Sequence, residues 1–401
     1  MNKPIPDFVP IARDDVAFLG SGPVSALPYY DPAWFELERE AVFRRSWLQV
    51  GHVCELPEPG SFIRREIEVL KASVLVVRGK DGEIRAFHNV CTHRGTQLVE
   101  EAQGKTARFT CPYHGWTFGQ DGGLLSAPDF EQFNVAKADC ALTTVHLEIV
   151  AGLIFLHFGS PETSLREEMG PLADRMEQLP IAQATTISEY VYEIDANWKI
   201  TYDNFQENYH LRFIHPNTAG PGCGGDNPFG YPEEFGFQGD HRTQTIWTNP
   251  EMRMPGPVQG VSFMRIGASL MKRNLMVPGA EKNYFALFPS FFLFGNPATH
   301  FSHVVYPIAA NKSRGVIRLY WVGDDENASE RYAREFGMAM TRDIHVEDRS
   351  VIERGQRGLE SGALRHINLQ TNESLLRHFF NVVDGKVQAY RAELEAQGAL
   401  R

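Results

Sequence analysis

Cysteine and histidine occur together twice in the sequence, in a spacing that can hold an iron–sulfur cluster. The first segment contains Cys91 and His93, and the second contains Cys111 and His114. Two thiolates suit one iron of a [2Fe–2S] cluster, and two neutral imidazoles suit the other. The same Cys2His2 set could hold a structural zinc ion. A zinc finger usually pairs Cys with Cys and His with His, so the alternation favours the iron–sulfur cluster.

A second group of chemically capable residues follows in the middle of the chain. His210 and His215 lie in one helix-like stretch, with Asn204 and Glu207 just before them. Two histidines and one carboxylate form the facial triad of non-haem Fe(II) oxygenases. Five residues correspond to about 140° of rotation on an ideal helix, so both imidazoles can meet one metal only if the helix is distorted. Pro216 favours such an ending.

The third ligand of this metal site must come from elsewhere in the chain. Acidic residues are frequent in a late, helix-like segment around residues 343–353. A run of charges on a helix is usually a solvated face, so most of these acids are expected to face water. The spacing alone leaves four candidates, which are Asp343, Glu347, Asp348 and Glu353.

Length, composition and charge limit the classes of function. The chain has 401 residues and a net charge of −11, a sign that a non-specific nucleic-acid binder would not normally carry. It contains no apolar run long enough for a transmembrane helix and no apolar signal core near residue 1, so we expect neither membrane insertion nor secretion. Five cysteines are too few for a disulfide framework, which favours a reducing, cytoplasmic location.

Hydrophobic patterning and turn residues predict the elements that position these groups. We expect short strands and turns from about residue 50 to 158, and a long irregular loop over residues 217–260, which are rich in Gly, Pro and Asn. The predicted helices cover residues 28–48, 161–178, 201–215 and 326–357. Further strands are predicted over residues 191–200, 284–295, 300–308 and 314–323.

Both groups of residues belong to motifs with a family resemblance. The segments CTHRG and CPYHGW resemble the two cluster loops of Rieske proteins, and NWKITYDNFQENYHLRFIHP resembles the catalytic motif of Rieske non-haem iron oxygenase α subunits. VEDRSVIERGQRGL resembles the helix that supplies that family's carboxylate ligand. The resemblance implies that Cys91, His93, Cys111 and His114 hold the cluster. It also implies that His210, His215 and Asp348 hold iron, with Glu347 as the second choice for the carboxylate.

The resemblance implies an α+β fold in three parts. Residues 1–45 would form an N-terminal helical segment that packs on the catalytic domain. Residues 46–160 would form a β-rich Rieske [2Fe–2S] domain, and residues 161–401 a catalytic domain with an antiparallel sheet covered by helices. A head-to-tail homotrimer is expected, which would place each cluster near a neighbour's iron, and a small β subunit could accompany it.

The activity implied by the resemblance is that of a terminal oxygenase acting on a small molecule with O2. The chain lacks a dinucleotide fingerprint, so NAD(P)H would act through a separate flavin or iron–sulfur reductase or a ferredoxin. Glu207 would connect His210 to His114 of a neighbouring subunit and so carry electrons, and Asn204 would lie near the iron.

The substrate class stays open at this stage. The frequency of aromatic substrates in the family favours hydroxylation of an aromatic compound. The alternative is a monooxygenase or N-demethylase of a quaternary ammonium compound, because Glu at position 207 is common among relatives that oxidise choline, betaines or carnitine, whereas many ring dioxygenases have Asp. A Rieske electron carrier without oxygenase activity is a more remote alternative, since it leaves His210 and His215 unexplained. A zinc-stapled binding module is another.

Overall fold

The computed structural model divides into two compact units, and each is described by itself. It describes residues 11–254, 256–276, 279–295, 300–323 and 327–398. One unit is Arg44–Glu162, and the other combines Met1–Phe43 with Thr163–Arg401. The first unit extends two residues beyond the predicted 46–160 at either end. The N-terminal segment belongs to the larger unit, although residues 1–10 lie outside the described part of the chain.

The smaller unit is built from two antiparallel sheets that hold the two Cys–His loops. Its seven-stranded sheet has the order β3-β12-β11-β6-β5-β4-β7, and its three-stranded sheet has the order β10-β9-β8. The strands of the larger sheet are β3 (Leu48–His52), β4 (Ser61–Ile67), β5 (Ala72–Arg78), β6 (Ile84–His88), β7 (Gln103–Lys105), β11 (Thr144–Val150) and β12 (Leu153–His157). Those of the smaller sheet are β8 (Phe109–Thr110), β9 (Thr117–Phe118) and β10 (Leu124–Ser126).

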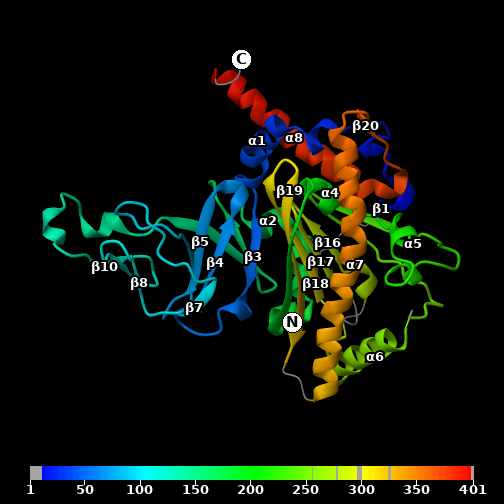
Figure 1. Cartoon of the computed structure of the whole chain (residues 1–401), viewed down its shortest axis with the longest axis horizontal. Coiled ribbons are helices and arrows are strands. Elements are labelled where there is room, and N and C mark those ends of the chain that lie inside the picture. Colours follow the sequence, from blue (N-terminus) through cyan, green and yellow to red (C-terminus); the bar gives the residue numbers. More distant parts are fainter. Residues whose placement is uncertain (1–10, 255, 277–278, 296–299, 324–326, 399–401) are drawn as a thin grey trace. The chain divides into compact units, whose positions relative to one another are not determined.

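The larger unit is organised around one antiparallel sheet with helices packed against it (Figure 1). Its strand order is β1-β14-β15-β16-β17-β18-β19-β13. The strands are β1 (Ile11–Ala12), β13 (Ala184–Ile194), β14 (Glu234–Gln238), β15 (His241–Gln244), β16 (Tyr284–Leu287), β17 (Phe291–Gly295), β18 (His300–Ala309) and β19 (Lys312–Val322). A separate two-stranded pair joins β2 (Val24–Ser25) to β20 (His366–Ile367).

Eight α-helices are present in the described residues, and the longest carries the late acidic segment. Figure 1 shows this helix, α7, in orange beside the strands of the larger sheet. The helices are α1 (Pro32–Glu38), α2 (Leu165–Met169), α3 (Pro171–Glu177), α4 (Trp198–Asp203), α5 (Leu211–Ile214), α6 (Pro257–Lys272), α7 (Ala328–Glu360) and α8 (Ser374–Ala396). The α+β prediction is therefore confirmed.

A buried ion pair fastens the N-terminal segment to the rest of the larger unit. Glu38 on α1 and Lys199 on α4 are almost fully buried, with Nζ 2.7 Å from a carboxylate oxygen. The indole N–H groups of Trp34 and Trp198 also donate to this carboxylate, at 2.9 and 2.8 Å. All polar atoms of the Glu38 head group are thus satisfied inside the core, as a buried charge requires.

The predicted single helix over residues 201–215 is wrong, and the difference shapes the site. Helix α4 ends at Asp203 and α5 begins at Leu211. Between them, the Glu207 carboxylate accepts the backbone N–H groups of Tyr209 and His210, and the Tyr284 hydroxyl donates to the carbonyl of Phe205. These contacts occupy groups that a continuous helix would pair with one another.

Several other boundaries also differ from the prediction. The predicted loop 217–260 contains the β14–β15 hairpin and the start of α6, and the predicted helix 28–48 is limited to α1 and a π-helical turn over Arg39–Phe43. Gly170 separates α2 from α3, where one helix was predicted. The predicted strand 191–200 ends at Ile194, because Asn197 caps α4. Residue 326, the predicted start of the late helix, lies outside the described residues.

Candidate functional site

The two Cys–His loops of the smaller unit form tight turns around the predicted cluster ligands. The backbone N–H of Gly95 donates to the carbonyl of Cys91, and that of Gly115 donates to the carbonyl of Cys111. Both glycines have positive φ angles, of 81° and 71°, which a residue with a side chain rarely adopts. The glycines therefore allow each loop to turn back on its own cysteine.

The four predicted ligands fit a two-plus-two cluster better than a single metal ion. Cys91 and Cys111 are both 2% exposed. The imidazole rings of His93 and His114 lie 4.7 Å apart, and Nδ1 of His93 is buried without a hydrogen-bond partner. Within the described residues, these four side chains do not converge on one point as the ligands of a zinc ion do. The donor set and the orphaned Nδ1 fit a [2Fe–2S] cluster.

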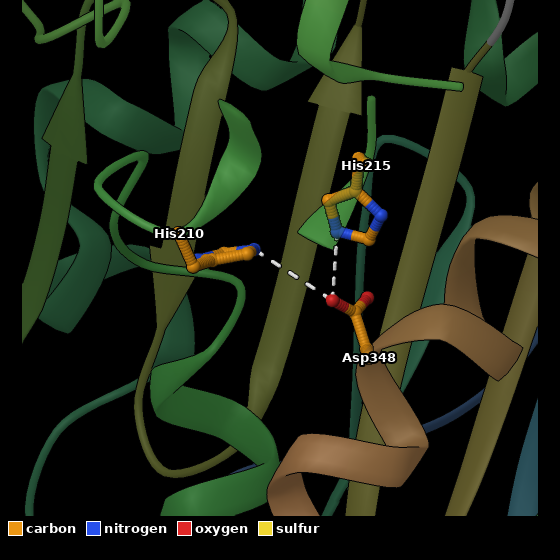
Figure 2. Close-up of side chains that lie close together, drawn as sticks. All are labelled: His210, His215 and Asp348. Atoms are coloured by element: carbon orange, nitrogen blue, oxygen red, sulfur yellow. Dashed lines mark ion pairs between the residues drawn. The ribbon is translucent and has the colours of Figure 1, made fainter. Parts of the chain in front are cut away.

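His210, His215 and Asp348 come together in the larger unit from α5, its flanking turns and α7. Their ligand atoms all lie within 4.8 Å of one another (Figure 2). Nε2 of His215 is 2.8 Å from Oδ1 of Asp348, and Nε2 of His210 is 3.7 Å from the same oxygen. Asp348 is 2% exposed and its Oδ1 accepts no hydrogen bond. Three donor atoms that face one another in this way are arranged for a shared cation.

Carboxylates behind the two histidines orient their rings toward this point. Nδ1 of His210 is hydrogen-bonded to Glu207, and Nδ1 of His215 is 2.7 Å from Glu347. When Nδ1–H donates to a carboxylate, the lone pair of Nε2 is left for a metal. Burial lowers the pKa of His215, but Asp348 and Glu347 together raise it above its usual value. The site therefore attracts positive charge.

The geometry separates the two acids that the sequence left as alternatives for the third ligand. Glu347 accepts hydrogen bonds from Nδ1 of His215 and from the hydroxyl of Thr218, at 2.7 and 2.6 Å. Glu347 thus contacts the Nδ1 side of the His215 ring, whereas Asp348 faces its Nε2 side. This arrangement favours Asp348 as the ligand and gives Glu347 the role of orienting His215. Asp343 and Glu353 are not part of the group of three.

A cavity of about 1030 Å³ opens beside the three ligand residues. Asn204 and Glu207 also line it, as do aromatic side chains from several strands and loops: Phe205, Trp247, Tyr284, Phe292, Phe294 and Phe301. Its acidic lining residues are Glu207, Glu281 and Asp348. Among its described lining residues there is no Lys or Arg. The cavity is therefore apolar and aromatic, with an excess of negative charge.

Two protein-family models match the chain over most of its length. The Rieske [2Fe–2S] domain matches residues 46–144, and the ring hydroxylating alpha subunit (catalytic domain) matches residues 181–389. The chain belongs to the Rieske oxygenase α subunits. As in that family, the protein is an oxidoreductase with a Rieske [2Fe–2S] cluster and a mononuclear iron site, and it works with O2 and a reductase or ferredoxin.

Curated relatives of this oxygenase include proteins that act on quaternary ammonium compounds. The carnitine monooxygenase oxygenase subunit of Acinetobacter baumannii is 29% identical over 82% of this chain and 83% of its own length. The glycine betaine monooxygenase oxygenase subunit of Pseudomonas aeruginosa is 33% identical over 47% of this chain and 44% of its own. Aromatic dioxygenases also match, such as the 2-aminobenzenesulfonate 2,3-dioxygenase subunit alpha of Alcaligenes sp, which is 32% identical over 47% of this chain and 48% of its own.

Solved structures share the fold of this oxygenase. A quaternary ammonium Rieske monooxygenase in complex with L-carnitine has a TM-score of 0.73 at 22% identity, over 94% of this chain and 99% of that chain. A naphthalene 1,2-dioxygenase with bound indole has a TM-score of 0.69 at 19% identity, over 99% of this chain and 98% of that chain. In the described part of the oxygenase, no helix has both the length and the apolar character needed to cross a membrane.

Sequence reasoning missed several residues of the cavity. His345, Trp247 and Glu281 all line it. The position of His345, three residues before Asp348, was a usable signal because residues three apart are neighbours on a helix surface. Trp247 and Glu281 lie in irregular segments, whose approach to the iron site depends on the tertiary fold.

Proposed function

We propose that this oxygenase hydroxylates a quaternary ammonium compound. The hydroxylated product then breaks apart, so that either an N-methyl group or the longer carbon substituent is lost from the nitrogen. The observation that carries the proposal is the aromatic, acidic cavity beside His210, His215 and Asp348. Aromatic rings and carboxylates stabilise a desolvated quaternary ammonium ion, which cannot form hydrogen bonds through nitrogen. A ferrous ion would offset two of the three lining carboxylates and leave the cavity with a net negative charge.

The carnitine and glycine betaine monooxygenase subunits support this proposal more than the aromatic alternative. The aromatic prediction rested on frequency within the family, whereas the match to the carnitine monooxygenase subunit covers 82% of this chain and the match to the aromatic dioxygenase subunit covers 47%. Glu207, which suggested quaternary ammonium substrates from the sequence, lines the cavity and binds Nδ1 of His210. An anionic aromatic substrate would meet carboxylates and no lining Lys or Arg among the described residues.

The proposed reaction is a monooxygenation that consumes one O2, two protons and two electrons. One atom of O2 enters a C–H bond of the substrate, and the other leaves as water with two protons and two electrons from the reductase. When the hydroxyl is placed on an N-methyl carbon, the hydroxyl loses its proton, the C–N bond breaks, formaldehyde leaves and the amine keeps the electron pair of that bond. Iron held by His210, His215 and Asp348 would supply the O2 activation, and the aromatic lining would orient the cation and exclude water.

We also propose that Glu207 carries electrons between subunits in a homotrimer. Its Oε1 binds Nδ1 of His210, and its second oxygen accepts two backbone N–H groups, so its position is fixed. The remaining half of the bridge would be His114 of a neighbouring chain, since a hydrogen-bonded carboxylate can link two metal-ligand imidazoles. Native mass spectrometry of the purified oxygenase tests the trimer, and a monomer would contradict this route. A β subunit would appear there as a second chain.

Turnover with a panel of substrates tests the proposed function. The iron-loaded oxygenase would be supplied with a chemical electron donor and O2, and then incubated separately with glycine betaine, carnitine, choline, benzoate and naphthalene. Mass spectrometry would detect demethylated or hydroxylated products. We expect product from at least one quaternary ammonium compound and none from the aromatic compounds. Product from an aromatic compound alone would contradict the proposal.

A further inference from the structure

One carboxylate of the substrate cavity has no partner within the described part of the chain. Glu281 lines the cavity from the turn Ala280–Lys282, just before β16, and is exposed to solvent. Its side chain forms no hydrogen bond or ion pair with any described residue. The neighbouring cation, Lys282, pairs with Glu234 at 3.7 Å instead. Glu281 therefore brings a negative charge to the cavity that no described side chain offsets.

The other two acids of the cavity are already engaged at the iron site. Asp348 is 2% exposed and faces Nε2 of both His210 and His215. One oxygen of Glu207 binds Nδ1 of His210, and its other oxygen accepts two backbone N–H groups. Of the three acids that line the cavity among the described residues, Glu281 is thus the one whose charge remains for a ligand.

Backbone pairing places Glu281 next to aromatic residues of the cavity. The N–H of Ile246 donates to the carbonyl of Glu281 at 2.6 Å, just beyond the antiparallel pairing of β15 with β16. Trp247 follows Ile246 directly, Tyr284 follows Glu281 by three residues, and both aromatic side chains line the cavity. Aromatic faces bind quaternary ammonium groups, and a carboxylate beside them adds charge attraction.

Exposure shows that this group lies on a solvent-facing side of the cavity. Glu281 is exposed, Phe263 is 44% exposed and Trp247 is half-buried, whereas His215 and Asp348 are 1% and 2% exposed. All five residues line the cavity. Trp247, Phe263 and Glu281 therefore form a rim, and the two iron ligands lie on a buried side. A charge at a rim attracts ligands of opposite charge and discriminates against the wrong sign.

We propose that Glu281 is a specificity-determining residue that attracts the positive charge of the substrate at this rim. This inference rests on the proposed function and deepens it, because it assigns the carboxylate that favours a cation over an uncharged group of the same shape. The group that Glu281 recognises is a trimethylammonium group, whose nitrogen cannot form hydrogen bonds. Charge and aromatic contact are then the means of binding it.

Pairs of ligands that differ only in charge at one atom test the inference. Calorimetry on the iron-loaded oxygenase without O2 would compare choline with 3,3-dimethylbutanol, glycine betaine with 3,3-dimethylbutanoate, and carnitine with 3-hydroxy-5,5-dimethylhexanoate. In each pair a carbon atom replaces the quaternary nitrogen and the shape is kept. We expect the wild type to bind at least one quaternary ammonium compound more tightly than its carbon analogue. High salt should reduce this preference, because mobile ions screen an exposed charge.

Variants of Glu281 separate charge recognition from a merely structural role. Glu281→Gln keeps the shape of the side chain, so the carbon analogues should bind as before, whereas the preference for the cation should fall about fivefold, the upper range for a solvent-exposed charge. Glu281→Asp keeps the charge and should keep most of the preference. Glu335→Gln is the matched control, because Glu335 is exposed on α7 and does not line the cavity. Absorbance of the Rieske cluster and circular dichroism would verify that each variant is folded.

The outcomes distinguish this inference from the proposed function. Full retention of the preference in Glu281→Gln would overturn the role of Glu281 but leave the proposed function standing. Equal binding of all three quaternary ammonium compounds and their carbon analogues by the wild type would also overturn it. An equal loss of both members of a pair in Glu281→Gln would indicate a structural role and overturn it as well. If the wild type binds none of the three quaternary ammonium compounds, the proposed function fails and the inference fails with it.

Discussion

The two neighbouring acids Glu347 and Asp348 should differ sharply in their effect on iron binding. Asp348 faces both Nε2 atoms of the histidine pair, whereas Glu347 contacts Nδ1 of His215 and the hydroxyl of Thr218. Replacing Asp348 by Asn removes a charged ligand. Replacing Glu347 by Gln keeps an acceptor of similar shape behind His215 but removes the charge that makes the imidazole a stronger ligand.

The expected magnitudes follow from these contacts. Loss of an outer partner of a metal-bound histidine typically weakens metal binding by about 10–100-fold, or about 1.4–2.7 kcal/mol. Because both hydrogen bonds go to one oxygen, Oε2, which a Gln carbonyl oxygen can replace, Glu347→Gln should lie near the tenfold end, and Glu347→Ala near the hundredfold end. Asp348→Asn should exceed both, since the iron then loses one of three protein ligands together with a negative charge.

Chelator competition provides the assay. Iron retained at the mononuclear site would be measured against a graded series of chelator concentrations, with the absorbance of the Rieske cluster as an internal control in the same sample. Glu353→Gln is the matched control on the same helix, since Glu353 pairs with Arg349 at 2.9 Å outside the site. It should bind iron as the wild type does. Complete loss of iron in Glu347→Gln with retention in Asp348→Asn would refute this assignment of the ligands.

Three further predictions concern electron transfer, pH and stability. Glu207→Gln should keep both metals but slow product formation at least tenfold under single turnover, because the charge of the bridge is lost; an unchanged rate would remove the bridge. Burial raises the pKa of Asp203 to about 7, so the proton stabilises the folded state below that pH and this contribution disappears as pH rises through 7. Urea unfolding from pH 5 to 8 should therefore show the stability of the wild type falling relative to Asp203→Asn by about 2.7 kcal/mol, mostly between pH 5 and 7, and a constant difference would contradict it. Glu38→Ala should destabilise the fold by about 3–5 kcal/mol in the same assay, because Lys199 is left buried without its partner; a loss below about 1 kcal/mol would show that water reaches the pair.

Local sequence was sufficient for the ligand motifs but not for the path of the chain between them. Cys91, His93, Cys111 and His114 lie in short turns whose glycines are visible in the sequence, and His210 and His215 had to converge on one metal, which required a distorted helix. Where the distortion occurs depends on the Tyr284 hydroxyl, which reaches the Phe205 carbonyl from 79 residues away. Helical periodicity carries no information on such a contact.

The errors over residues 217–260 have a different cause. Frequent Gly and Pro indicated a loop, yet Phe235 and Phe237 alternate with smaller or polar residues before a Gly239–Asp240 turn, which is a hairpin signal. Gly239 has a φ of 54°, as such turns require. The Gly and Pro content of the whole segment 217–260 favoured a loop and hid this short hairpin pattern. The substrate cavity was beyond sequence reasoning, because its aromatic residues come from segments that only the folded sheet brings together.

Single turnover at the mononuclear site tests the central claim most directly. The cluster- and iron-loaded oxygenase would be reduced without O2, mixed with glycine betaine, carnitine or choline, and then exposed to one pulse of O2. Product would be counted per mononuclear iron. We predict a substantial fraction of one product per iron in the wild type, and none in Asp348→Ala despite an intact, reoxidised cluster. Undiminished product in Asp348→Ala, or product from an aromatic acid and from none of these compounds, would contradict the account.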